Sequence, residues 1–115
     1  MLNPKSGEIW LVRFPFSDLT STKVRPALVL TTHRQEAIIL GIFSKISPDA
    51  IGNIALLIEN THPNFAQTGL LKTSLLRADK IATAHQSMFQ RQLGILSSDF
   101  KPELQIAIKQ ALNLK

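Results

Sequence analysis

The sequence predicts one small domain with a mainly β fold and a helix at its C-terminal end. Five short apolar segments, separated by turn-forming residues, are typical of strands in an antiparallel sheet or small barrel. The last part of the chain shows instead the apolar spacing of a helix. The length of 115 residues fits a single domain, residues 1–115, because a chain of this size can bury enough surface for one core.

Each expected strand is an apolar run bounded by Gly, Pro or polar residues. These strands cover residues 7–14, 25–32, 37–45, 54–59 and 74–82. Pro26 cannot donate a hydrogen bond in mid-strand, so we expect the second strand to start there. The segment 37–45 is apolar almost without interruption, which predicts a strand buried on both faces.

Two helices follow the strands in this prediction. The segment "SMFQRQLG", residues 87–94, is expected to form a short helix that ends at Gly94. The C-terminal helix is capped by Ser97 or Ser98, and Asp99 lies in its first turn, where a negative charge is favoured. Along one face of this helix, apolar side chains recur at helical spacing: Leu104, Ala107, Ile108, Ala111 and Leu112.

The composition restricts the classes of function. The formal net charge of +5 favours a polyanionic partner. The absence of Cys excludes disulfides, thiolate nucleophiles and Cys-based zinc sites. The opening residues lack the apolar core of a signal peptide, and no apolar run approaches the roughly 18 residues of a membrane span. We therefore expect a soluble, cytoplasmic protein with no membrane contact.

The known cofactor and metal motifs are missing from the sequence. It contains no Walker A loop, no GxGxxG, no HExxH and no GxSxG. The three histidines, His33, His62 and His85, do not have the spacing of metal ligands, and His33 and His62 fall beside turn-like stretches. We expect no metal site and no cofactor.

The segment "SLLRADKIA" places Arg77 and Asp79 two residues apart in an otherwise apolar strand. Successive side chains of a strand point to opposite faces, so Arg77 and Asp79 share one face, while Leu76, Ala78 and Lys80 share the other. One interpretation is a surface salt bridge, worth at most about 1 kcal/mol. The other is an acid/base pair at an active site.

Two more polar residues stand at strand ends. Arg25 precedes Pro26, and Ser44 closes the apolar run "IILGIFSK". Each has a structural interpretation, as a solubilising charge or as a hydroxyl bonded to its own backbone. Together with Arg77 and Asp79, however, they suffice to cleave RNA. Such a reaction needs a base, an acid and cations around phosphorus, because RNA carries its own 2′-OH nucleophile. Asp79 is the candidate base, and Arg25 and Arg77 are candidate phosphate ligands.

Four blocks of the sequence resemble the MazF/PemK-type toxins of bacterial toxin–antitoxin pairs. They are "GEIWLVRF", "VRPALVL", "GIFSKI" and "LLRADKIATA", in matching order and spacing, and the resemblance that they mark extends over most of the chain. The resemblance implies a small β-barrel of SH3-like or CcdB/PemK type with a C-terminal helix, which forms a homodimer. It also implies a metal-independent endoribonuclease that cuts single-stranded RNA at a short sequence and leaves a 2′,3′-cyclic phosphate. A cognate antitoxin protein would block its site.

The resemblance assigns roles by position. Arg25 matches the catalytic or phosphate-binding arginine of the family's "RP" block, and Ser44 matches the Thr or Ser that contacts the scissile phosphate. Arg77 and Asp79 match an "R-x-D" that serves as acid and base, the arginine being the acid. The first loop, "PFSDLTSTKV", departs from the family pattern because it has no Gly, Glu or His. In this loop we expect Asp18, Thr20 and Lys23 to contact substrate, with Asp18 as the alternative base.

Two other functions remain open at this point. CcdB-like proteins share the fold and poison DNA gyrase by protein contact, without any chemistry. A catalytically silent barrel would bind RNA with strong salt dependence and leave it intact. Cleavage of RNA in EDTA distinguishes the ribonuclease from both.

Overall fold

The computed structural model describes residues 3–14, 23–45 and 52–114. Within these ranges, six strands form one antiparallel sheet in the order β4-β5-β3-β2-β1-β6. The strands are β1 Glu8–Phe14, β2 Lys23–His33, β3 Glu36–Phe43, β4 Ala55–Ile58, β5 Ser74–His85 and β6 Phe89–Ile95. The helix α2 spans Lys101–Ala111, and four short 3₁₀ turns are η1 Gly52–Ile54, η2 Ala66–Thr68, η3 Gln86–Met88 and η4 Ser98–Phe100. The mainly β fold with a C-terminal helix is confirmed.

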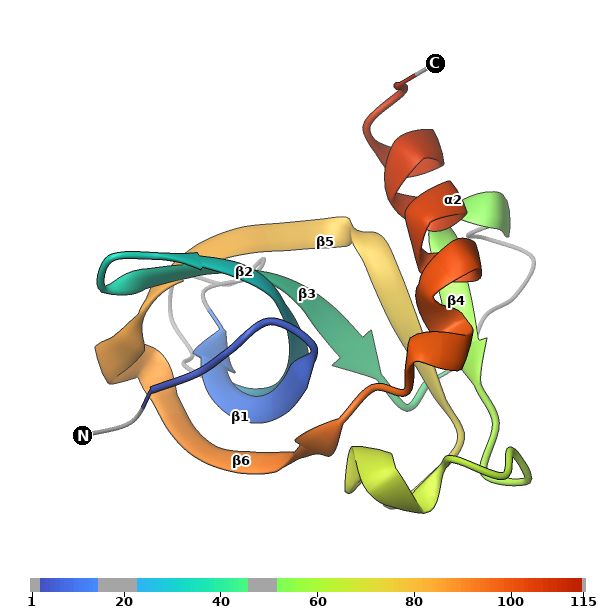
Figure 1. Cartoon of the computed structure of the whole chain (residues 1–115), viewed down its shortest axis with the longest axis horizontal. Coiled ribbons are helices and arrows are strands. Elements are labelled where there is room, and N and C mark those ends of the chain that lie inside the picture. Colours follow the sequence, from blue (N-terminus) through green and yellow to red (C-terminus); the bar gives the residue numbers. More distant parts are fainter. Residues whose placement is uncertain (1–2, 15–22, 46–51, 115) are drawn as a thin grey trace.

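The sheet is strongly curved (Figure 1). Its two faces bury separate clusters of apolar side chains. Along β3, alternate residues point into different clusters: Leu40 and Ile42 into one, Ala37 and Ile39 into the other. The predicted burial of this strand on both faces is therefore confirmed. The first cluster lies under α2, which contributes Ala107, and the second is enclosed by the curled strands.

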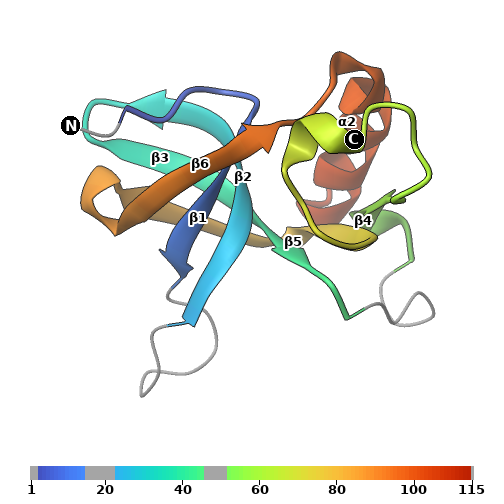
Figure 2. The ribbon, with the colours of Figure 1, turned by 90° about the horizontal axis from the view of Figure 1, so that it is seen from below.

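Figure 2 shows how these two parts are connected. The curved strands β1, β2, β3 and β6 form one part, α2 and β4 form the other, and β5 runs from one to the other. The two halves of β5 have different partners. Its first residues pair with both β4 and β3, whereas residues 81–85 pair with β3 only. Arg77 and Asp79 lie where β5 changes partners.

The predicted helix over residues 87–94 is wrong, because this segment forms η3 and then strand β6. Phe89 is buried and packs edge-on against Trp10, with 5.8 Å between ring centroids. Gly94 does not end a helix. A Cβ at Gly94 would come within 2.0 Å of the Gln67 carbonyl oxygen, so this glycine permits a close backbone approach. Pairing with β1 decides the local structure.

The predicted bounds of two other strands need correction, and one of them is β5, which runs on to His85 rather than ending at residue 82. β2 begins at Lys23 rather than at Pro26. Residues 23–26 pair with β1, whereas pairing with β3 starts at Ala27, so Pro26 lies where one side of β2 has no partner strand. A proline is tolerated at such a position.

The C-terminal helix is confirmed, but it begins at Lys101, so the predicted cap and the predicted first-turn Asp99 belong to the turn η4 before it. The Ser97 hydroxyl accepts a hydrogen bond from the Asp99 N–H, at 3.3 Å, and so caps the turn η4 that leads into α2. The predicted apolar face of α2 packs on the first cluster, except that Leu112 lies beyond the end of the helix and is exposed. In the part of the chain that the structure describes, no helix has the length and apolar character to cross a membrane.

Candidate functional site

Arg77 and Asp79 form a two-pronged ion pair on β5. Arg77 Nε donates to Asp79 Oδ1 at 3.0 Å, and Arg77 Nη2 donates to Oδ2 at 2.6 Å. The two side chains are 27% and 28% exposed, so the pair is accessible from solvent. The prediction that they share one face holds, since Leu76 and Ala78 are buried on the other.

An irregularity of β5 sets the place of this pair. Gly41 of β3 pairs with Arg77, but its neighbour Leu40 pairs with Ile81, so residues 78–80 of β5 have no residue opposite them on β3. The pairing of β5 with β4 also ends at Arg77. Asp79 therefore lies on a bulge, a feature that commonly re-aims a side chain beside a functional site.

The ion pair fixes the charge of both groups. The hydrogen bonds from Arg77, helped by its positive charge, lower the pKa of Asp79 against the opposing effect of partial burial. The same hydrogen bonds raise the pKa of Arg77. At neutral pH, Asp79 is thus a carboxylate and Arg77 a guanidinium cation.

Phe43 links this pair to Arg25. The Arg25 guanidinium carbon lies over the Phe43 ring at 5.1 Å from the centroid, and that of Arg77 lies over the same ring at 5.7 Å. The strands explain this convergence, because β3 lies between β2 and β5 and Phe43 pairs with Leu75, two residues before Arg77. Cations are attracted to the face of an aromatic ring, so Phe43 is a contact that the two guanidinium groups share.

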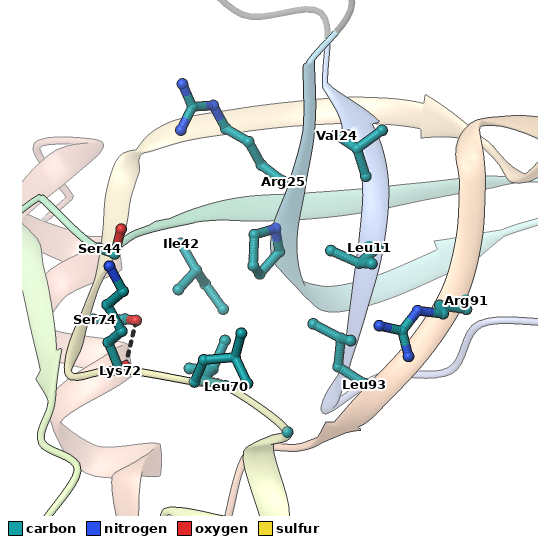
Figure 3. Close-up of a pocket in the computed structure, with 13 residues that line it drawn as sticks. Leu11, Val24, Arg25, Ile42, Ser44, Leu70, Lys72, Ser74, Arg91 and Leu93 are labelled. Atoms are coloured by element: carbon teal, nitrogen blue, oxygen red, sulfur yellow. Dashed lines mark hydrogen bonds between the residues drawn. The ribbon is translucent and has the colours of Figure 1, made fainter.

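A cavity of about 350 Å³ adjoins this cluster and also contacts Arg25. We call it the Leu93 cavity. Its lining consists of apolar side chains with cations and hydroxyls among them: Leu11, Val24, Arg25, Pro26, Ile42, Ser44, Gly69, Leu70, Leu71, Lys72, Ser74, Arg91 and Leu93. In Figure 3 the Arg25 guanidinium points away from the apolar side chains of the cavity. Arg25 therefore stands between the cavity and the Phe43 ring.

The structure divides the predicted site residues into three groups. Arg25 and Arg77 both contact the Phe43 ring, and Asp79 is joined to them through its ion pair with Arg77. Ser44 is exposed and lines the Leu93 cavity with Arg25, but it is not part of the Arg77–Asp79 pair. Lys23 is exposed at the start of β2, two residues before Arg25. The predicted substrate contacts Asp18 and Thr20 lie outside the described residues.

The histidines lie away from this site and have local hydrogen bonds or solvent contact. His85 accepts from the Ser87 N–H and caps η3, His62 accepts from the Asn64 N–H and stacks on Phe100, and His33 is exposed. Among residues 3–14, 23–45 and 52–114, no three His, Asp or Glu side chains are grouped so that they could hold a metal ion.

Sequence reasoning missed Phe43, Lys72 and Arg91. In the sequence, Phe43 is one more apolar residue of its strand, although it directly precedes Ser44. Its role depends on which strands flank β3. Lys72 and Arg91 reach the Leu93 cavity from the segment before β5 and from β6, and the latter was expected to be helical. Only the pairing of distant strands identifies these three residues.

Comparison with known proteins decides the family. The model of the PemK-like, MazF-like toxins of type II toxin–antitoxin systems matches residues 5–112. The chain belongs to this family. No curated protein sequence matches the chain at a significant level.

Solved structures of MazF toxins have the same fold. The Mycobacterium tuberculosis toxin MazF-mt6 superposes with a TM-score of 0.73 at 21% identity, over 94% of this chain and 98% of that chain. An endoribonuclease in complex with its cognate antitoxin, from a mycobacterial species, gives 0.71 at 13% identity, over 98% of both chains. MazE–MazF from Deinococcus radiodurans gives 0.71 at 16% identity, over 100% of both chains. The fold predicted for a PemK/MazF-like toxin is thus confirmed.

Proposed function

We propose that this toxin is an endoribonuclease that cleaves single-stranded RNA through the RNA's own 2′-hydroxyl, without a metal ion. The observation that carries the proposal is that Arg25 and Arg77 share the Phe43 ring while Arg77 also holds the Asp79 carboxylate. Two phosphate-binding cations and a carboxylate base are the groups that such a reaction needs. The family, and the endoribonuclease among the structures of the same fold, support it.

The ion pair suggests how RNA enters the site. The Arg77 fork, which binds the Asp79 carboxylate, also fits two oxygens of a phosphate. When the scissile phosphate takes that fork, the Asp79 carboxylate becomes free to accept a proton. Arg25, attached to the same ring, lies within reach of the same phosphodiester. Ser44 donates a hydrogen bond to a phosphate oxygen from the cavity side.

The proposed reaction is an in-line transesterification. Asp79 takes the 2′-OH proton, the 2′-oxygen attacks phosphorus, and the bond from phosphorus to the 5′-oxygen breaks. Arg77 gives a proton to the leaving 5′-oxygen. This transfer is favourable even with a raised pKa of Arg77, because an alkoxide is the stronger base. One product ends in a 2′,3′-cyclic phosphate and the other begins with a 5′-hydroxyl.

The partners follow from the same proposal. The substrate is single-stranded RNA in the cytoplasm, bound also by Asp18 and Thr20, which precede β2 in the sequence, and by Lys23 at the start of β2. The toxin works as a homodimer, and a cognate antitoxin covers its basic site. Expression of this chain alone should halt growth, and co-expression of a small acidic antitoxin should restore it. Normal growth with verified, folded toxin would contradict this part of the proposal.

The decisive experiment is incubation of the purified protein with single-stranded RNA in EDTA, followed by mapping of the RNA ends. We expect cleavage to a 2′,3′-cyclic phosphate and a 5′-hydroxyl, and none where the ribose at the cut site is 2′-deoxyribose. Cleavage of the deoxy substrate at the same bond would refute the mechanism. If the protein binds RNA but leaves it intact, it is the catalytically silent RNA-binding barrel. If it inhibits gyrase and does not bind RNA, it is a CcdB-like toxin.

A further inference from the structure

We propose that a second cavity, between α2 and the curved strands, binds a small amphipathic anion, an aliphatic carboxylate whose charge pairs with Lys101. The cavity has a volume of about 400 Å³, within the range of small-molecule sites, about 300–1,000 Å³. We call it the Leu104 groove. It shares no described lining residue with the Leu93 cavity, so this site is separate from the proposed RNA site.

The groove lies where α2 meets the curved part of the sheet. Leu28 and Leu30 line it from β2, and Leu104 and Ile108 line it from α2. Leu96, in the link between β6 and η4, also contributes to the lining. Figure 2 shows that the chain passes from β6 directly into the part that contains α2. A ligand in the groove therefore contacts both parts of the molecule.

The apolar lining of this groove is aliphatic. It consists of leucines, a valine and an isoleucine, and the described lining contains no aromatic residue. Leu30, Leu96, Leu104 and Ile108 pack against the first cluster but remain partly exposed to solvent. A ligand that removes this surface from water is favoured by the hydrophobic effect. Without an aromatic face to stack on, an alkyl chain suits the groove better than a flat ring does.

Polar groups without partners lie beside this apolar surface. Ser98, Lys101 and Gln105 are exposed and line the groove. None of the three has an ion-pair or hydrogen-bond partner among the residues that the structure describes. Lys101 and Gln105 are four residues apart and so are neighbours on the helix surface, in the row next to Leu104 and Ile108. The helix thus presents a polar row beside an apolar row, as an amphipathic ligand requires.

The charge of the groove selects an anion. Lys101 is the one charged residue of the described lining, which includes no Asp or Glu. Of the carboxylates next to lining residues in the sequence, those of Glu8 and Asp99 accept hydrogen bonds from other side chains. Glu103 lies about 200° around the helix from Lys101. One ammonium without a partner can form a charge-assisted hydrogen bond with one carboxylate.

A dimer formed through the exposed apolar side of α2 would leave the groove open. Ile106 is 57% exposed on α2. Two residues along a helix correspond to a rotation of about 200°, so Ile106 lies on the opposite side of α2 from Leu104 and Ile108. A second copy that packs on Ile106 therefore does not cover the groove.

The test is titration of the purified protein with octanoate, an eight-carbon carboxylate, in a calorimeter. 1-Octanol, which has the same chain length and no charge, is the control ligand. Lys101→Gln removes the charge, and its matched control is Lys109→Gln, since Lys109 is exposed on α2 but does not line the groove. Gln105→Phe fills the groove from an exposed position, and Gln110→Phe, at an exposed position outside the groove, is its control.

We expect one octanoate to bind per chain with a dissociation constant below about 1 mM. Lys101→Gln should weaken binding about 10-fold, because it removes one charge-assisted hydrogen bond, and Gln105→Phe should abolish binding. The two control variants should bind as the wild-type protein does. 1-Octanol should bind the wild-type protein about 10-fold more weakly than octanoate. No saturable binding, or equal affinities of Lys101→Gln and wild-type protein for octanoate, would overturn the inference.

A competition experiment shows whether octanoate occupies the arginine site instead. An uncleavable 2′-deoxy oligonucleotide should not displace octanoate, because the two cavities share no described lining residue. Displacement would place the carboxylate on Arg25 or Arg77 and would refute the Leu104 groove as its site. This readout does not need cleavage, so it gives the same answer whether or not the protein cuts RNA.

Thermal unfolding gives an independent readout of binding between the two parts of the molecule. At about ten times the dissociation constant, octanoate should raise Tm of the wild-type protein by about 5 °C, because it binds the folded state only. Tm of Gln105→Phe should not respond, whereas Tm of Gln110→Phe should rise as in the wild-type protein. A lowered Tm, or an equal rise in Gln105→Phe and wild-type protein, would contradict binding in the groove.

Discussion

The Arg77 guanidinium holds the Asp79 carboxylate with two hydrogen bonds, at 3.0 and 2.6 Å. The Asp79 carboxylate occupies the two Arg77 donors that a substrate phosphate would use, so in the free protein it takes the place of that phosphate. The cost of opening the ion pair is small, since both side chains are accessible and exposed ion pairs contribute only about 0–1 kcal/mol. Substrate phosphate can therefore exchange with Asp79 without disturbing the fold.

Removal of either arginine should slow cleavage strongly. Loss of one preorganised donor to a developing charge costs roughly 10²–10³ in rate, and we expect this loss in kcat/KM for Arg25→Ala and for Arg77→Ala. Arg34→Asn is the matched control. Arg34 is exposed in the turn between β2 and β3 and has φ of 58°, which Asn tolerates. Equal losses in all three variants would indicate a general charge effect.

Asp79→Asn should abolish most of the activity without unfolding the protein. The amide keeps the shape of the side chain but cannot accept the 2′-OH proton. Thermal unfolding should change little, because Asp79 is accessible on a bulge. Single-turnover cleavage measures the effect. Full activity of this variant would place the base elsewhere, and Asp18→Asn would then be the variant that loses cleavage.

The sequence predicts the parts of this fold that local patterns determine. Apolar runs mark the five strands, and helical spacing marks α2, because burial selects the side chains at those positions. Strand β6 has no such pattern. Residues 90–92 are exposed on the last strand of the sheet, while Phe89 is buried in the second cluster and Leu93 packs, partly buried, against the first. The strand form of β6 depends on pairing with β1, which periodicity does not report.

The same distinction applies to the site. Arg77 and Asp79 share a face because of the two-residue period of a strand, so the sequence is sufficient to pair them. The contact of Arg25 with Arg77 through Phe43 depends on which strands flank β3 and in what register. The unpaired residues 78–80 are likewise a product of long-range pairing. Local patterns contain no information about either.

The pH dependence of cleavage should show whether the substrate phosphate replaces the Asp79 carboxylate on Arg77. In the free toxin, the pKa of Asp79 lies below the ordinary value of about 3.9, so kcat/KM should stay level down to about pH 4. In the RNA complex, Asp79 loses the Arg77 hydrogen bonds and gains a negative neighbour, and both changes raise its pKa. The acid limb of kcat should therefore lie at higher pH than that of kcat/KM. If the acid limbs of kcat and kcat/KM lie at the same pH, the phosphate does not replace Asp79 on Arg77.

The ion pair should also affect stability at low pH. Since folding lowers the pKa of Asp79, its contribution is present above the unfolded value of about 3.9 and is lost as pH falls through the folded value. The free energy of unfolding should therefore fall less between about pH 6 and pH 3 in Asp79→Asn than in the wild-type protein. Urea unfolding at the two pH values measures it. An unchanged difference would mean that the pair contributes nothing to stability.

The proposed homodimer should depend on apolar side chains left exposed on one half of the molecule. Leu57 on the edge strand β4 is 42% exposed, and Ile106 on α2 is 57% exposed. We expect a dimer in light scattering at about micromolar concentration, and a monomer for Leu57→Lys. The control is Ile81→Lys, since Ile81 is 37% exposed on the half of β5 that pairs only with β3. A monomeric wild-type protein would refute the dimer.

Phe43 should prove to be a positioning residue for the two arginines. Phe43→Leu keeps an apolar side chain but removes the ring, and each cation–π contact is worth about 0.5–1 kcal/mol at an accessible site. Loss of both should lower kcat/KM by about 5- to 30-fold. Phe43→Tyr retains the ring and should restore activity, while thermal unfolding checks that all variants are folded.

A double-mutant cycle distinguishes positioning from a general packing effect. If Phe43 acts through the guanidinium groups, Phe43→Leu should cost less in the Arg25→Ala background than in the wild-type protein, because one of its two contacts is already gone. In the Arg77→Ala background the cost should shrink for the same reason. In the Arg34→Asn background it should stay the same. Additive losses with all three arginine variants would show that the ring supports the sheet and does not position the arginines.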